Sequence, residues 1–352
     1  MGISVAMATY NGERYLSEQL DSIARQTLLP DELVVCDDQS SDSTRAVVET
    51  FGQTAPFPVH FHENSQRLHF ADNFLRAAAR CQGDYVAFCD QDDVWLPEKL
   101  ERVAEAFDRT GAALVAHQAL SFTEGSDREE SFQFAHHGVL LADDLFPWHF
   151  FFGFACTFRR DLLDVSPAEL RPFDVIDPRR RLAHDRWITF LATTRGVVVA
   201  LPDELTRYRQ HDTNESGWMR SGRSAGAAYS AARNRFAYNL AKHLSAARRF
   251  IEILEEQIAK HEGADHDDLG QLLDRWRELD AAYRARLAIA EEDTRAGRIK
   301  RWGKAMRDGA YRSSVAERPL PMSAREFTLA LIARPGQRDL AKSMLSQATY
   351  PE

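Results

Sequence analysis

The stretch Tyr85-Val86-Ala87-Phe88-Cys89-Asp90-Gln91-Asp92-Asp93-Val94-Trp95 decides the fold. It starts as a short apolar run, typical of a buried strand, and continues directly into three carboxylates within four residues. Residues 33–36 form a similar apolar run that ends in Asp37-Asp38, and residues 3–8 form another at the start of the chain. The pattern predicts buried strands whose ends carry polar groups.

Amphipathic segments separate these runs. Apolar residues recur at helical spacing over residues 13–26, 43–51 and 71–81, and residues 59–61 supply one further short strand. Strands that alternate with helices in this way indicate βαβ units and a mostly parallel sheet. Ligands bind such sheets beyond the carboxyl ends of the strands, where the acidic tails lie.

The pattern changes after about residue 217. Apolar residues recur every three or four positions over 225–261 and again over 269–287, which predicts two long helices in an antiparallel hairpin. Ser323 and Glu326 fit a capping box that opens a last helix. We therefore expect an α/β domain over residues 1–219 and an all-α region over residues 220–352.

Charge divides the chain at the same place. The 352 residues carry a net charge of -9, which argues against a general nucleic-acid binder. Residues 1–219 hold 20 of the 44 Lys and Arg and 35 of the 53 Asp and Glu, so the excess of acid lies in the first part. The second part is basic, and residues 295–312 concentrate Lys and Arg around Trp302.

The basic stretch has two interpretations. It fits a peripheral contact with an anionic membrane, and it equally fits a solvated helix face packed on the first domain. The long hairpin is also a candidate for self-association. The four cysteines are widely spaced and suit a reducing compartment, and no secretory signal is visible, so we expect a cytoplasmic protein.

The acidic tails also have two interpretations. One Asp or Ser at each strand end could cap the following helix. Capping accounts for only one of the three carboxylates at Asp90, Asp92 and Asp93, and the others would repel one another. Hard divalent cations select oxygen ligands, and Mg²⁺ or Mn²⁺ is typically bound by one or two carboxylates together with substrate phosphates. A metal–diphosphate site is the better explanation.

These motifs resemble those of family 2 glycosyltransferases, most closely the bacterial subgroup called rhamnosyltransferases. The resemblance covers about residues 2–216 and rests on the following segments in order: Met7-Ala8-Thr9-Tyr10-Asn11-Gly12, the Asp37-Asp38 pair, the Asp90–Asp93 form of the D-x-D motif, residues 151–160, Ala183-His184-Asp185-Arg186-Trp187 and Tyr208-Arg209-Gln210-His211. It implies a GT-A fold, a Rossmann-like unit that binds a nucleotide-diphosphate sugar.

The resemblance also implies roles for single residues. Asp38 is expected to accept a hydrogen bond from a pyrimidine N–H, Asp90 to approach the ribose, and Asp92 to hold the metal. The whole nucleotide-binding set is Ala8, Thr9, Tyr10, Asn11, Asp38, Arg67, Asp90 and Gln91. Arg67-Leu68-His69 departs from the family's usual Asn-Leu-Gly; Arg67 could contact phosphate or be solvated, and His69 replaces the glycine.

Asp185 is the candidate general base, and its alternative role is the cap or first-turn acid of the following helix. His211 is a candidate metal or diphosphate ligand, or an ordinary surface or core histidine. Arg209 could neutralise the diphosphate. The residues expected around the donor sugar and the acceptor are Gly153, Phe154, Ala155, His184, Trp187 and Arg209.

The sequence thus predicts an inverting, metal-dependent transfer of a sugar, with L-rhamnose suggested by the subgroup, from a dTDP- or UDP-linked donor. The acceptor would be a hydroxyl of a bacterial surface glycan or lipid-linked glycan. A nucleotidyltransferase is a rival, but residues 9–13 lack the Gly-rich basic loop that it needs. A non-catalytic sugar-nucleotide-binding or scaffold module is the second rival, and the intact acids at 90, 92 and 185 argue against it.

Overall fold

A computed structural model describes residues 2–125, 128–132, 137–146, 149–174, 180–211, 228–260, 265–292 and 294–312. The chain divides into two compact units, Met1–Leu170 with Ala183–Gly217, and Arg171–Leu182 with Trp218–Glu352. The helix expected from Ser323 lies outside the described residues.

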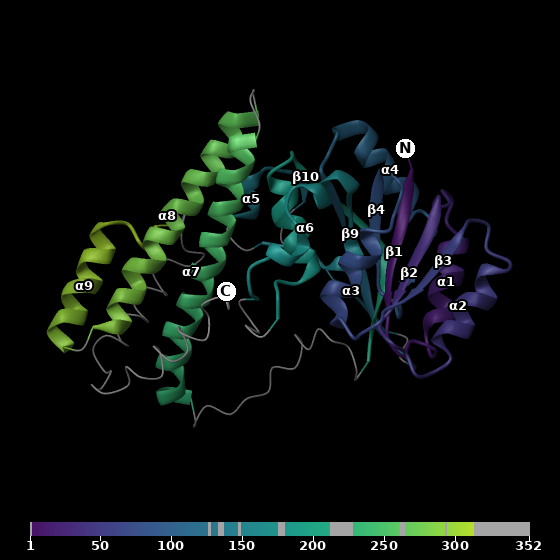
Figure 1. Ribbon diagram of the computed structural model, residues 1–352, viewed down its shortest axis with the longest axis horizontal. Helices are drawn as coiled ribbons and strands as arrows, with labels where there is room; N and C mark the ends of the chain where they lie inside the picture. Colours follow the sequence, from purple (N-terminus) through teal and green to yellow (C-terminus); the bar gives the residue numbers. More distant parts are fainter. Residues whose placement is uncertain are drawn as a thin grey trace. The chain divides into compact units, whose positions relative to one another are not determined.

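The first unit is built on one mixed sheet of ten strands. The strands are β1 (Ile3–Thr9), β2 (Glu32–Asp37), β3 (Val59–Glu63), β4 (Tyr85–Cys89), β5 (Val94–Trp95), β6 (Leu114–Thr123), β7 (Glu129–Phe132), β8 (Gly138–Leu140), β9 (Cys156–Arg159) and β10 (Val198–Gln210). The order is β3-β2-β1-β4-β9-β6-β10-β5, with β7 beside β6 and β8 beside β10. Figure 1 shows β1, β2 and β4 lying next to one another.

Strand direction changes in the middle of this sheet. β3, β2, β1 and β4 are parallel, whereas β9 runs antiparallel to both β4 and β6, and β6 is parallel to β10. The expected mostly parallel sheet is confirmed for the first four strands. Residues that follow β4 and β10 project at the same edge because both strands run in the same direction.

Helices cover both faces of the sheet. They are α1 (Leu16–Ala24), α2 (Thr44–Gly52), α3 (His69–Ala78), α4 (Lys99–Thr110), α5 (Ala142–Leu145) and α6 (His184–Thr193), with 3-10 turns η1 (Gly153–Ala155), η2 (Arg160–Asp164) and η3 (Ala168–Leu170). Three of the helices match the segments expected from periodicity to within a few residues at each end, as α1 shows by burying Leu16, Leu20 and Ile23.

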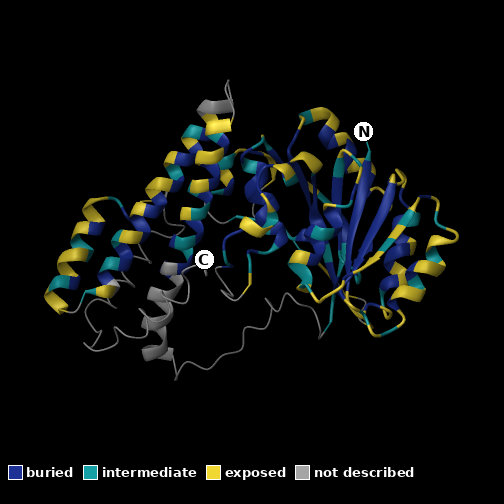
Figure 2. Ribbon diagram, in the orientation of Figure 1, coloured by how far each residue is buried: buried dark blue, intermediate teal, exposed yellow. Residues whose placement is uncertain are grey.

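Alternation along the strands assigns the helices to faces. Val5, Leu33 and Ala87 lie in one apolar cluster with residues of α1, α2 and α4. The next residue of β4, Phe88, points to the opposite face and meets Phe74 of α3, with ring centroids 5.5 Å apart. Buried residues accordingly run through the strands in Figure 2, while the outer faces of the helices are exposed.

The second unit contains α7 (Ala228–Lys260), α8 (Asp265–Glu291) and α9 (Arg295–Arg307), and α8 packs against both of the others. The predicted hairpin is confirmed by α7 and α8, whose apolar stripes meet where Phe250 contacts Trp276 at 4.8 Å between ring centroids. Among the described residues, no helix is long and apolar enough to span a membrane.

Candidate active site at the carboxyl edge of the sheet

The residues after β4 meet the residue after β10. Asp92 Oδ2 lies 2.8 Å from Nε2 of His211, although the two positions are 119 residues apart in the sequence. Both side chains are partly buried, with 18% of Asp92 and 15% of His211 exposed. The fold therefore brings into contact the two residues that the sequence suggested as metal ligands.

Arg209 supports this turn from behind. Its backbone N–H donates to Asp93 Oδ1 at 3.1 Å, and its Nε donates to the backbone oxygen of Asp92 at 2.8 Å. The guanidinium also pairs with Glu18 and lies over the ring of Tyr15, and its side chain is only 4% exposed. These contacts fix the Asp90–Asp93 turn to β10. The diphosphate contact expected of Arg209 stays a prediction.

The carboxylates of the turn raise one another's pKa. Loss of water contact, followed by the charges of Asp92 and Asp185, raises the pKa of Asp90 to about 8. Burial, followed by the charges of Asp92 and Asp90, raises the pKa of Asp93 well above its usual range. Asp93 Oδ2 is buried without a hydrogen-bond partner among the described residues. The charge of Lys99 offsets this effect only in part, so the cluster keeps an excess of negative charge and one carboxylate oxygen lacks a donor among the described residues.

This donor set is compatible with a divalent cation that also binds a substrate. In the described ranges no group of three or more His, Cys, Asp or Glu side chains is arranged to hold a metal. Asp92 and His211 could supply two ligands, and Mg²⁺ or Mn²⁺ commonly takes few protein ligands and completes its shell with phosphate oxygens and water. The residues present fit a metal whose remaining ligands come from a diphosphate.

Asp185 lies in the first turn of α6, where an acid is favoured by the helix dipole. It is not the cap, because the residue at that position is Ala183 and no side-chain cap bond forms there. Its Oδ1 accepts from the backbone N–H of Arg186 at 2.7 Å, and its side chain is 8% exposed. Its charge contributes to the raised pKa of Asp90, so Asp185 belongs to the same edge of the sheet.

The residues expected around the sugar and acceptor form a packed layer. His184 stacks on Phe74 at 4.1 Å between ring centroids, and a Cβ on Gly153 would clash with Nε2 of His184, so glycine is needed there. Phe154 stacks on Tyr208 at 4.9 Å. Every member of the set is buried: Gly153, Phe154, Ala155, His184, Trp187 and Arg209. Direct contact with a sugar or an acceptor remains a prediction for them.

The ends of β1 and β4 are joined by a side chain. Gln91 Oε1 accepts from the backbone N–H of Tyr10 at 2.9 Å, and Gln91 Nε2 donates to the backbone oxygen of Tyr10 at 3.1 Å. Thr9 donates from Oγ1 to Asp37 Oδ1 at 2.7 Å, and the N–H of Asn11 donates to Ser40 Oγ at 2.8 Å. Ala8 lies in the buried part of β1. Hydrogen bonds thus link the ends of β1, β2 and β4, where Tyr10, Asn11 and Gln91 lie above the buried residues Ala8 and Thr9.

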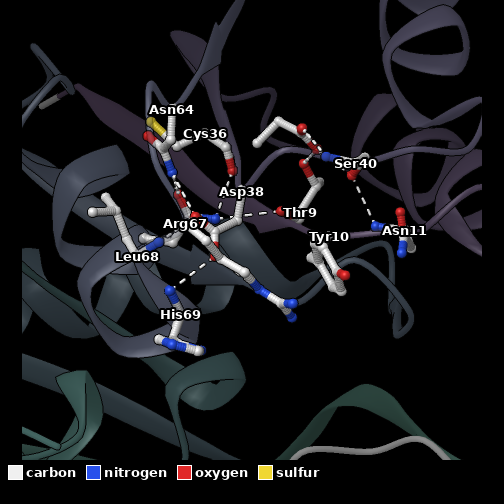
Figure 3. A network of polar contacts seen from close by, with 12 residues as sticks. Thr9, Tyr10, Asn11, Cys36, Asp38, Ser40, Asn64, Arg67, Leu68 and His69 are labelled. Carbon is white, nitrogen blue, oxygen red and sulfur yellow. Dashed lines mark hydrogen bonds and ion pairs between the residues drawn. The ribbon is translucent and has the colours of Figure 1, made fainter.

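Asp38 holds the loop before α3 (Figure 3). Its carboxylate accepts from the backbone N–H groups of Leu68 at 2.6 Å and His69 at 2.8 Å and from Asn64 Nδ2 at 3.1 Å, and it is 3% exposed. His69 has φ +65°, a conformation that suits the glycine it replaces. The base contact expected of Asp38 stays a prediction, and in this conformation the loop already engages both of its oxygens.

Arg67 lies over the exposed ring of Tyr10. Its guanidinium carbon is 3.8 Å from the ring centroid, and its Nε is 3.9 Å from Asp38 Oδ2 (Figure 3). Because 45% of the Arg67 side chain is exposed, a phosphate contact and a solvated side chain both stay open. Tyr10 and Arg67 form a flat, cationic platform at the carboxyl edge of β1.

Lys99, a residue of this region that the sequence reasoning missed, is completely buried. Its Nζ donates to the backbone oxygen of Phe154 at 2.7 Å and to Thr206 Oγ1 at 3.2 Å. Burial lowers its pKa to about 7, against the charges of neighbouring groups that include Cys89 and Asp93. A signal existed in the sequence, since Lys99 shares the buried face of α4 with Val103 and Ala106 at helical spacing.

Comparisons with known proteins agree with this fold. Residues 4–165 match the model of glycosyl transferase family 2. An uncharacterised glycosyltransferase of Nostoc is 32% identical over 227 residues, covering 61% of this chain and 66% of the relative. A dTDP-rhamnosyl transferase of Shigella flexneri is 25% identical over 224 residues, covering 60% of this chain and 73% of that protein.

The chain spans less than two thirds of the length of several curated relatives that it matches. Among solved structures, S. aureus TarS residues 1-349 in complex with UDP is 18% identical with a TM-score of 0.53, covering 100% of this chain and 93% of that one. This likeness concerns the fold. The matched model shows that residues 4–165 form a domain of glycosyltransferase family 2, and the relatives agree with this assignment. The solved structures support the fold alone, which is a GT-A fold followed by a helical region.

Proposed function

We propose that this protein transfers a sugar from a nucleotide-diphosphate donor to a hydroxyl group of a glycan acceptor, with inversion at the anomeric carbon. The observation that carries the proposal is the pairing of Asp92 with His211 beside Asp90 and Asp185 at one edge of the sheet. A site short of positive charge and fitted for a divalent cation suits a substrate that brings a diphosphate.

Asp92 and His211 would hold the cation, Mg²⁺ or Mn²⁺. When bound, such an ion neutralises the charge that develops on a diphosphate leaving group. The platform of Tyr10 and Arg67 would carry the nucleotide base, with Asp38 fixing the loop that bears Arg67. Gln91 would keep the ends of β1 and β4 at a constant distance beneath the nucleotide.

Asp185 would take the proton from the acceptor hydroxyl as its oxygen attacks the anomeric carbon. The new C–O bond forms on the face opposite the breaking bond to the diphosphate, through an oxocarbenium-like transition state. Asp185 is suited to this role because it lies near Asp90 and is partly buried. The preceding residue, His184, packs against Gly153 of η1 and stacks on Phe74 of α3, which holds this turn of α6 in place.

The donor is best sought among dTDP- and UDP-sugars. A dTDP-rhamnosyl transferase is among the relatives, which favours dTDP-L-rhamnose, and the structurally similar TarS was crystallised with UDP. Both nucleotides present a pyrimidine with two carbonyl oxygens, which the guanidinium of Arg67 is able to contact as a donor.

The test is a panel of sugar nucleotides with Mn²⁺, in which release of the nucleoside diphosphate is measured for the wild type and for Asp185→Asn. We expect turnover of at least one donor by the wild type, a kcat lower by about 10²–10⁴-fold in Asp185→Asn, and similar donor affinity in both. Metal-dependent binding without turnover of any donor, with and without glycan acceptors, would instead support a non-catalytic sugar-nucleotide-binding module.

The acceptor is proposed to lie at a membrane surface, because α9 has the pattern of an interfacial helix. Ile299, Trp302 and Met306 lie at positions i, i+3 and i+7 and so share one stripe of the helix, and Ile299 and Met306 are exposed. Exposed basic residues lie around the rest of α9 and just after it: Arg295, Lys300, Arg301, Lys304, Arg307 and Arg312. In the described part of α9 and its flanks, only Arg301 and Lys304 among these form ion pairs. An anionic bilayer complements such a face.

Sedimentation with vesicles tests this contact. We expect binding to vesicles containing phosphatidylglycerol and little to pure phosphatidylcholine. Lys300→Glu with Arg307→Glu should weaken it by at least about 10-fold, at about 1 kcal/mol for each basic residue. The matched control, Lys260→Glu with Arg277→Glu, has the same net charge and should bind like the wild type. Equal loss in both pairs would refute a specific role for α9. Self-association of the helical unit stays a separate prediction, which a measurement of the molar mass by light scattering would test.

A further inference from the structure

Lys99 occupies a position that is costly for a lysine. It is the first residue of α4, where the helix dipole disfavours a cation, and its side chain is completely removed from water. Burying an ammonium group costs several kcal/mol unless its donors are well satisfied. Sequences depart from the locally favoured residue mainly at functional or strained sites, so this lysine requires an explanation beyond core packing.

The contacts of Lys99 join parts of the chain that are distant in sequence. Its Nζ donates to the backbone oxygen of Phe154 in η1 and to Thr206 Oγ1 in β10, and it lies 3.7 Å from the ring centroid of Trp95 in β5. One ammonium group thus satisfies a turn and a strand from opposite sides. An apolar side chain could not do so, because the buried backbone oxygen of Phe154 would lose its donor.

Each of these two partners leads to one half of the candidate site. Next to Phe154 lies Gly153, against which the ring of His184 packs, and His184 immediately precedes Asp185. On the other side, Thr206 lies in β10, which continues to Arg209 and His211. The ring of Phe154 also stacks on Tyr208, so η1 and β10 are tied twice.

We propose that Lys99 is a positioning residue, which fixes η1 against β10 and so sets the distance between Asp185 and the Asp92–His211 pair. This inference rests on the proposed transfer reaction, in which the base and the leaving diphosphate act on opposite faces of one anomeric carbon. Lys99 itself touches neither substrate. Substitution of Lys99 should misplace Asp185, and a displacement of about 1 Å in such geometry can lower the rate by about 10²-fold.

The test compares Lys99→Met, which keeps the length of the side chain and removes its donors, with Arg102→Met. Arg102 lies on the same helix, is exposed and pairs with Glu105 and Asp203 at the surface. In Lys99→Met we expect kcat to fall by about 10–100-fold and the affinity for the nucleoside diphosphate with Mn²⁺ to stay within about 3-fold. Arg102→Met should match the wild type in both.

Hydrogen exchange measures whether Lys99 holds η1 against β10, and it does not depend on turnover. Backbone amides of residues 153–156 and 184–188 should exchange faster in Lys99→Met, while those of β1 and β2 should not change. If Lys99→Met does not fold, Thr206→Val removes one partner while keeping a β-branched residue in the strand, and should show the same changes at smaller size.

An unchanged kcat in folded Lys99→Met, or a fall in kcat that matches an equal fall in donor affinity and in folded fraction, would overturn the proposal. Failure of the proposed function looks different: the wild type would then turn over no donor, while the exchange rates would still report whether Lys99 holds η1 to β10.

Discussion

The acids after β2 and the acids after β4 occupy equivalent places in the sheet and have opposite surroundings. Asp37 and Asp38 accept hydrogen bonds from backbone and side-chain donors. The carboxylate of Asp38 alone accepts three, all from N–H groups. At the end of β4, Asp93 has an oxygen without a donor among the described residues, and the pKa of Asp90 is raised to about 8.

The difference separates carboxylates that are fully hydrogen-bonded from carboxylates that lack partners. A carboxylate filled with N–H donors is stabilised in its charged form and holds a loop in place. A carboxylate that lacks donors and lies beside other carboxylates is destabilised in its charged form, and a nearby cation would relieve this. Substitutions at the end of β2 should therefore change the stability of the fold. Substitutions at the end of β4 should change activity or the pH dependence of stability.

The largest effect is expected for Asp92→Asn. Removing the charge that pairs with His211 should lower kcat/KM by at least about 10²-fold, the size typical of removing one electrostatic stabiliser of a transition state. Thermal stability without metal should be kept or increased, because the turn loses a repulsive charge. Turnover and melting temperature, measured on the same preparation, check both parts. A loss of activity that is explained by unfolding would contradict the distinction.

Asp38→Asn should have the opposite profile. Its new amide group would confront one of the N–H donors of the loop, and an unsatisfied buried donor costs about 1–3 kcal/mol. Chemical denaturation should report this loss of stability in the absence of any ligand. Glu49→Gln is the control, since Glu49 is exposed and pairs with Arg45 at the surface. Equal stability of Asp38→Asn and wild type would show that the loop is not held by this carboxylate.

Asp90→Asn should reveal the charge deficit as a dependence on pH. The pKa of Asp90 is about 8 in the folded protein against an ordinary 3.8, so its ionisation opposes folding. The penalty is absent below pH 3.8, grows as pH rises and is complete above about 8. In EDTA, Asp90→Asn should thus melt higher than the wild type by more at pH 8.5 than at pH 5, at about 2–4 °C for each kcal/mol regained. A gain independent of pH would contradict this origin.

The smallest effect is expected at His69, on the side of the satisfied carboxylate. Its φ of +65° is costly for a residue with a Cβ, and glycine adopts it freely, at the expense of a more flexible unfolded chain. His69→Gly should therefore stabilise the protein by at most about 1 kcal/mol. His69→Val, which is β-branched, should be clearly destabilising in the same denaturation experiment.

Much of the fold followed from local patterns. The runs at β1, β2 and β4 and the helices between them were predicted because each carries its own period. β6, β9 and β10 were not assigned as strands. The pairing of β9 with β4 depends on contacts between segments some 70 residues apart, which no local period encodes. The long helices α7 and α8 were predicted because their apolar stripes extend over many turns.

The site was predictable where a motif lies directly after a strand. Asp92 and His211 were expected near a metal, and the structure brings them together. The burial of the Arg209 guanidinium beside Tyr15 and Glu18 could not be predicted, because these partners come from a part of the chain about 190 residues earlier, and its expected diphosphate contact stays a prediction. Lys99 was missed because a lysine in an amphipathic segment is normally solvated.

The long sequence separation of Asp92 and His211 has a consequence for synthesis on the ribosome. The second partner is translated 119 residues after the first, an interval on the order of 6–24 s at about 5–20 residues per second. During that time the emerging chain carries the carboxylates of β4 without β10, the strand that supplies Arg209 and His211. A nascent chain consequently lacks the contact between Asp92 and His211 until β10 has been translated and has joined the sheet.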